Sequence, residues 1–150
     1  MRSKCLWVVV VGSLLAGGIL QSAVGKDTGD DVLKNIQGTW KFVSQSRDGK
    51  PRPNEEVTKQ TITFAGDKWT VHRDGKVVQA GTHKFDPDKK PSQVDAVVME
   101  GEDKGSSMLG IYELKGDTMK VCFDPKGKDR PTDFASKAGR MTATVEREKK

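Results

Sequence analysis

Cysteine is nearly absent from this sequence. The 150 residues contain two, Cys5 and Cys122. So few cysteines exclude a disulfide-rich scaffold and a zinc site built from several thiolates. If the N-terminal segment is removed, as argued below, only Cys122 remains and no internal disulfide can form. The fold must therefore be stabilised by its core alone.

Histidine and catalytic motifs are also scarce. The two histidines, His72 and His83, lie on opposite sides of an Asp74-Gly75 turn. A two-residue turn there puts His72 opposite Val77 and His83 roughly 20 Å further along its strand, at about 3.3 Å per residue. They cannot share a metal ion, and we expect each to be a surface residue or a satisfied one. No phosphate-binding glycine loop, G-x-S-x-G elbow or H-E-x-x-H motif is present. We expect Cys122 to be a half-buried thiol, and the protein to be no enzyme and to need no metal or cofactor.

Charge of one sign does not accumulate anywhere in the chain. The 26 lysines and arginines are spread among 21 aspartates and glutamates, and aromatic residues make up only 6%. A nucleic-acid groove needs clustered basic residues, with stacking aromatics for single strands. We therefore expect a mixed-charge surface and no nucleic-acid partner.

One long apolar run stands near the N-terminus. Arg2 and Lys4 precede a mostly apolar stretch over 5–20 that is broken by glycines, and Ala23 and Gly25 follow it. A basic start, a short apolar stretch and small residues at this spacing indicate a secretory signal peptide. A spanning helix needs a longer unbroken run. We expect cleavage after Gly25, a secreted or periplasmic protein, and no membrane span after cleavage.

The predicted domain organisation follows from this cleavage. Residues 1–25 form the signal peptide, 26–32 a flexible polar segment, and 33–150 a single domain. Asp30 is the expected N-cap of a short helix over 31–36, and a second helical turn is expected over 54–59. The remaining patterns predict eight short strands, at 37–46, 60–65, 68–73, 76–85, 93–100, 107–115, 118–124 and 140–147.

Two-residue turns fix the register of three hairpins. A turn at Gly66-Asp67 pairs Phe64 with Trp69 and Ile62 with Val71. A turn at Asp74-Gly75 pairs Val71 with Val78 and Trp69 with Ala80. All of these apolar side chains then share one face.

The turn at Gly116-Asp117 gives the same kind of result. It pairs Leu114 with Met119, Tyr112 with Val121, and Gly110 with Phe123. The opposite face pairs Glu113 with Lys120. Eight such consecutive strands predict an all-β fold, an eight-stranded antiparallel up-and-down barrel with a short N-terminal helix.

Two stretches resemble a known family. IQGTWK (36–41) and LGIYELKGDTMKVCFDPKGKDRPTDF (109–134) resemble a secreted lipocalin-like domain family of unknown function, found mainly in planctomycete bacteria. The resemblance covers about 33–148. Gly38 and Trp40 are also similar to the glycine-x-tryptophan motif of true lipocalins. That resemblance implies that Trp40 closes one barrel end and that Arg147 packs on it through a cation–π contact. The family has no known catalytic residues, so none is implied.

These patterns predict a secreted, non-enzymatic binding module. An eight-stranded barrel either fills with side chains or holds one small ligand. In the second case an unknown small apolar molecule is the partner, and the expected cavity lining is Ile62, Phe64, Trp69, Val71, Tyr112, Val121 and Phe123. The alternative is a filled barrel that serves as a structural or protein-interaction component of the cell envelope. Loops often carry binding sites, and Lys126, Lys128 and Arg130 are candidate ligands for an anion.

Overall fold

The structure is a computed structural model that describes residues 28–149. The predicted signal peptide and the first two residues of the predicted flexible segment lie outside this range. The described elements are α1 (Gly29–Ile36), β1 (Gly38–Arg47), β2 (Lys50–Pro51), α2 (Asn54–Val57), β3 (Gln60–Ala65), β4 (Lys68–Arg73), β5 (Lys76–Asp86), β6 (Ser92–Gly101), β7 (Ser107–Lys115), β8 (Thr118–Asp124) and β9 (Met141–Arg147).

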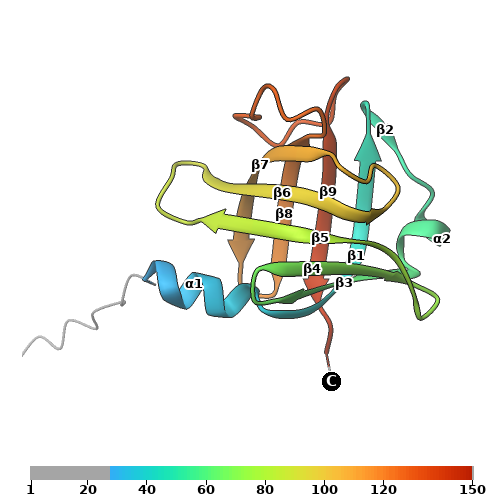
Figure 1. The fold of residues 1–150 in the computed structure, drawn as a ribbon, viewed down its shortest axis with the longest axis horizontal. Helices are drawn as coiled ribbons and strands as arrows, with labels where there is room; N and C mark the ends of the chain where they lie inside the picture. The colour runs from blue at the N-terminus through green and yellow to red at the C-terminus, as the bar shows by residue number, and fades with distance from the viewer. Residues whose placement is uncertain (1–27, 150) are drawn as a thin grey trace, which may run out of the picture.

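The strands form a closed antiparallel barrel (Figure 1). Strands β1 and β3 to β9 follow one another around it in chain order, and β9 pairs with β1 to close the ring. The two-residue strand β2, which the sequence did not predict, extends the sheet only beside the end of β1. The predicted all-β fold of eight antiparallel strands with a short N-terminal helix is therefore confirmed.

Helix α1 begins earlier than predicted. Its N-cap is Thr28 rather than Asp30, and Thr28 and Asp31 form a reciprocal capping box. The Thr28 hydroxyl is the acceptor for the Asp31 backbone N–H, and the Asp31 carboxylate accepts from the Thr28 backbone. A capping box satisfies two helix-end donors at once, so it outcompetes a single aspartate cap. The second helix, α2, ends at Val57, two residues before the predicted end.

Two of the three predicted hairpins have the predicted register. The turn at Gly66-Asp67 pairs Phe64 with Trp69, and the turn at Gly116-Asp117 pairs Tyr112 with Val121. Phe123 lies against the bare backbone of Gly110, where an added Cβ would be 2.4 Å from its ring. Glu113 does face Lys120, as predicted. Its ion pair, however, is formed with Lys115 on the same strand, at 2.7 Å.

The third hairpin departs from prediction after its first pairs. His72 faces Val77 as expected, but Val71 then faces Gln79 and Trp69 faces Gly81, because Val78 forms a β-bulge. A second bulge follows at Met99, between the pairs Ala80–Glu100 and Gly81–Val98. Gly81 allows this close packing, since an added Cβ would lie 1.8 Å from the Val97 carbonyl oxygen. Bulges bend strands and help a sheet close into a barrel.

A second, smaller apolar layer covers the outside of the barrel. Ile111 and Cys122 face each other across β7 and β8, on the side opposite Tyr112 and Val121, and both are fully buried. The segment 125–140 is held beside these strands by hydrogen bonds from Arg130 to the carbonyl oxygens of Val94 and Gly110. The sequence predicted only a half-buried Cys122. Burial raises the pKa of its thiol.

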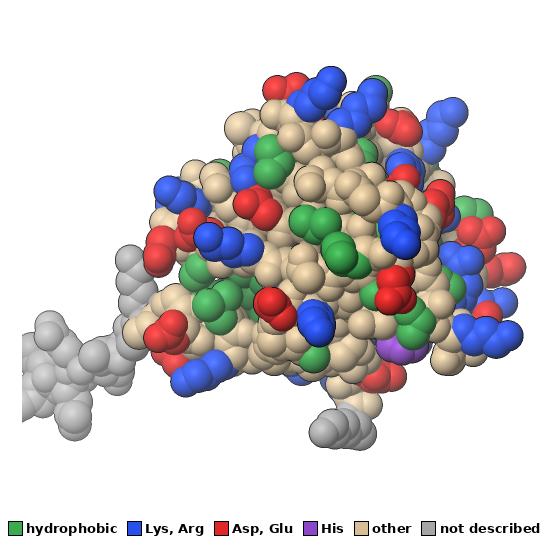
Figure 2. Space-filling model, in the orientation of Figure 1, with side chains coloured by type: hydrophobic (Ala, Val, Ile, Leu, Met, Phe, Trp, Pro, Cys, Tyr) green, Lys and Arg blue, Asp and Glu red, His purple; other side chains and the backbone are tan. Residues whose placement is uncertain are grey.

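The exposed surface carries both signs of charge. On the face seen in Figure 2, lysines and arginines alternate with aspartates and glutamates rather than forming a patch of one sign. No helix within residues 28–149 is both long enough and apolar enough to cross a membrane.

Candidate functional site

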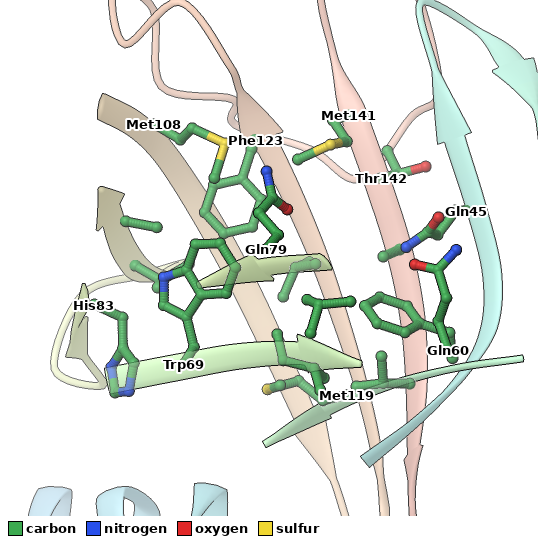
Figure 3. A pocket seen from close by; sticks show the side chains of 18 of the residues that line it. Gln45, Gln60, Trp69, Gln79, His83, Met108, Met119, Phe123, Met141 and Thr142 are labelled. Atoms are coloured by element: carbon green, nitrogen blue, oxygen red, sulfur yellow. The ribbon is translucent and has the colours of Figure 1, made fainter. Parts of the chain in front are cut away.

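The barrel encloses a cavity of about 150 Å³ (Figure 3). Six of the seven predicted lining residues contribute to it, namely Ile62, Phe64, Trp69, Val71, Val121 and Phe123. The alternating pattern of the strands placed these side chains on one face, and closure of the sheet turns that face inward. Further apolar lining comes from Phe42, Phe85, Val94, Ala96, Met108, Met119, Met141, Ala143 and Val145.

Tyr112 is the predicted lining residue that the structure places elsewhere. Its ring packs edge-on against Phe85, with centroids 5.0 Å apart, and Phe85 rather than Tyr112 lines the cavity. Tyr112 instead borders a hollow beneath α1, together with Leu114 and Arg147. Burial raises the pKa of its hydroxyl to about 12.

One end of the barrel is closed by Trp40 and Arg147. Trp40 is fully buried and donates its indole N–H to the Ile36 carbonyl at the end of α1. The Arg147 guanidinium carbon lies 4.3 Å from the centroid of the Trp40 ring. The same guanidinium donates to the backbone carbonyls of Asn35 and Gln37. Gly38, between these groups, has a φ of 111°, which a residue with a side chain rarely adopts. The contact implied by the lipocalin resemblance is therefore present.

The opposite end is the mouth, which is lined by polar side chains. These side chains come from three parts of the chain. Strand β1 and the segment after it contribute Gln45, Arg47 and Arg52. Strands β3 and β5 contribute Gln60 and Gln79, and the β6–β7 turn contributes Glu102 and Asp103. Arg47 forms an ion pair with Asp103 at 3.1 Å. Three strands separate β1 from β6 in either direction around the barrel. This ion pair therefore spans the mouth from one side to the other.

His83 lies in the cavity wall, contrary to the prediction of a surface or satisfied residue. Its ring packs edge-on against Phe64 and Phe85, with centroids 5.3 and 4.8 Å away. Within residues 28–149, neither buried ring nitrogen makes a hydrogen bond of normal geometry. Burial lowers the pKa of His83, and the Lys68 backbone and the Asp67 charge oppose this only in part. The neutral imidazole is therefore favoured near pH 7. The bulge that turns this part of β5 inward gave no signal in the sequence.

The three predicted anion-binding residues have different surroundings. Arg130 donates to the Gly110 carbonyl at 2.7 Å and pairs with Asp95 at 2.6 Å, so its guanidinium fastens the loop to β6 and β7. Lys126 and Lys128 have exposed side chains, and their backbone N–H groups donate to the Asp124 carboxylate. These bonds lower the pKa of Asp124, together with a stronger one from the Asp129 backbone. The contacts of Arg130 in the structure are thus with the backbone of β6 and β7 and with Asp95.

Within residues 28–149 no three histidine, cysteine, aspartate or glutamate side chains group as a metal ion would require. Comparisons of the chain with protein-family models, with curated proteins and with solved structures found no match. The resemblance to a planctomycete family thus stays a prediction. The site must be interpreted from its own geometry.

Proposed function

We propose that this protein is an extracytoplasmic, non-enzymatic binding module that holds a small apolar molecule inside its barrel. The cavity of about 150 Å³, with its apolar lining, carries the proposal. Burial of apolar surface is worth roughly 25 cal/mol per Å², so a molecule that fills this space gains affinity without any polar contact. In another protein an engineered apolar cavity of about 150 Å³ binds benzene.

The cavity also supports this function over the alternative of an envelope component with a filled barrel. That alternative expects side chains to occupy the whole interior. Here the aromatic residues Phe42, Phe64, Trp69 and Phe123 instead line a space of about 150 Å³. Trp69 and Phe123 are labelled in Figure 3. The size of the space favours a molecule of about one ring over a long lipid chain.

The extracytoplasmic location rests on the N-terminal sequence. The basic start, the short apolar stretch over 5–20 and the small residues Ala23 and Gly25 support export. N-terminal sequencing of the exported protein should begin at Lys26. A mature chain that still contained Trp7 would contradict this part of the proposal.

Benzene is a direct probe of the cavity, and calorimetric titration would measure its binding. We expect the wild-type protein to bind benzene, and the variants Ala96→Leu and Ala143→Leu to bind it at least about tenfold more weakly, because both alanines line the cavity. Lys120→Ala is the control, since Lys120 is exposed on the outer face. Unchanged binding in both leucine variants would show that benzene binds elsewhere. Native mass spectrometry of protein from its own source would then identify a retained ligand.

A further inference from the structure

We propose that the ligand is a small neutral aromatic molecule that carries one hydroxyl or N–H group. Its ring lies between Trp69, Phe123 and the methionines, and its polar group lies near Gln60 and Gln79 at the mouth. This inference rests on the proposed function and names the chemical class that the same cavity selects.

The side chains around the cavity favour an aromatic ring. Trp69 and Phe123 come from opposite parts of the barrel, on β4 and β8, and both line the cavity with Met108 and Met141 (Figure 3). Met141 pairs with Phe123 across β8 and β9, and Met108 lies two residues from Gly110, which pairs with Phe123 on the other side. Aromatic rings attract one another in edge-to-face and offset arrangements, which a saturated ring cannot reproduce. Thioether sulfurs make favourable contacts with ring edges, and flexible methionines adapt to the shape of what they enclose.

The polar group is inferred from the glutamine side chains at the mouth. Gln60 is only 3% exposed, and its amide nitrogen donates to the Glu56 carbonyl at 3.2 Å. The Gln79 amide nitrogen donates to the Glu102 carbonyl at 2.7 Å. Each of these bonds uses the amide N–H of the glutamine and not its side-chain carbonyl oxygen. Both oxygens are therefore acceptors, and a ligand that donates a hydrogen bond complements them.

The charges at the mouth favour a neutral group. Arg47 is neutralised by Asp103 at 3.1 Å, and the remaining pair of charged lining residues, Arg52 and Glu102, is of opposite sign. Neither a carboxylate nor an ammonium group meets an excess of opposite charge. An ionised ligand would lose its hydration on entering the apolar cavity without compensation.

Calorimetric titrations with phenol, toluene, cyclohexanol and benzoate test each part of the inference. Phenol and toluene have nearly the same shape, and only phenol donates a hydrogen bond. We expect phenol to bind about two- to tenfold more tightly than toluene. Cyclohexanol and benzoate should each bind more weakly than phenol.

Two variants locate the polar group, and a third serves as a matched control. In Gln60→Leu or Gln79→Leu the preference should reverse, so that toluene binds more tightly than phenol. Gln93 lies outside the cavity lining, so Gln93→Leu should keep the preference of the wild type. Either glutamine variant suffices if the other fails to fold.

The outcomes separate this inference from the proposed function. If toluene binds at least as tightly as phenol, or if the phenol preference survives both glutamine variants, the inference is overturned while apolar binding stands. Cyclohexanol binding equal to phenol overturns the aromatic class, and benzoate binding equal to phenol overturns the neutral class. If neither benzene, toluene nor phenol binds, the proposed function fails as well.

Discussion

The guanidinium carbon of Arg147, on the last strand, lies 4.3 Å from the centroid of the Trp40 ring, on the first strand. The indole N–H is satisfied by the Ile36 carbonyl and the guanidinium by the carbonyls of Asn35 and Gln37. The indole N–H and the guanidinium thus both have partners, and their bonds connect the end of α1 to both strands. Trp40 and Arg147 together close the barrel end opposite the mouth.

Replacement of this tryptophan should be severe. Trp40→Ala removes a fully buried aromatic side chain, and we expect the free energy of unfolding to fall by roughly 3–5 kcal/mol. Urea unfolding followed by circular dichroism would measure it. Trp40→Phe keeps an aromatic face for Arg147 and should lose less. An unchanged midpoint in Trp40→Ala would mean that the ring does not stabilise this end.

The two faces of the β7–β8 hairpin should respond differently to substitution. Val121→Asp places a carboxylate in the apolar cavity wall, where an unpaired charge is strongly unfavourable, so the domain should unfold or be severely weakened. Lys120 is exposed and Glu113 pairs with Lys115, so Lys120→Ala should change stability by less than about 0.5 kcal/mol. Thermal and urea unfolding compare the two. Greater damage from Lys120→Ala would contradict the observed register.

Gly81 is expected to tolerate no side chain. An added Cβ would lie 1.8 Å from the Val97 carbonyl oxygen and 2.8 Å from the Trp69 ring, so Gly81→Ala should cost more than about 2 kcal/mol of stability. Gly66→Ala is the matched control. Gly66 has a φ of 63° and no atom within 4 Å of an added Cβ, so only the cost of a left-handed backbone applies, about 1–2 kcal/mol. Urea unfolding would compare the two variants. Equal urea midpoints would argue against the double bulge around Gly81.

His83 predicts a dependence of stability on pH. Burial lowers its pKa in the folded state, whereas the unfolded chain keeps a value near 6.5. Below about pH 6.5 the unfolded state therefore binds more protons, and stability falls as the pH falls toward the folded pKa. Above that pH the contribution is complete and constant.

Urea midpoints at pH 7.5 and pH 5.5 would test the role of His83. We expect His83→Gln to lose less stability than the wild type between these two pH values. His72→Gln is the control and should behave as the wild type does. If His83→Gln and the wild type lost the same stability between pH 7.5 and pH 5.5, groups other than His83 would cause the pH dependence.

Most of the barrel could be predicted because its local signals agree. Turn residues at Gly66-Asp67 and Gly116-Asp117 fix the register, and alternation then places Phe64, Trp69 and Val121 on the inner face. The unpredicted features depend on closure of the whole sheet. The bulge at Val78 shifts β5 by one residue, and that shift turns Gln79 and His83 toward the cavity.

Burial of both faces of β7 and β8 could not be predicted from the sequence either. Ile111 and Cys122 are covered because a distant segment, 125–140, is fastened over them through Arg130. Strand alternation predicts only one buried face, so the second layer could not be inferred from β7 and β8 alone. The mouth glutamines were missed for a related reason, since a buried Gln60 has no signature in a polar-apolar pattern.

The pairing of β1 with β9 makes completion of this fold depend on the far end of the chain. Trp40 on β1 pairs with Arg147 on β9, and these two strands are the first and the last of the ring in chain order. A contact between residues so distant in sequence carries a large loop-closure entropy, which slows folding of such topologies. A chain that lacks β9 would therefore leave two open sheet edges, at β1 and β8. The interior of the barrel is complete only once β9 has paired with both of its neighbours.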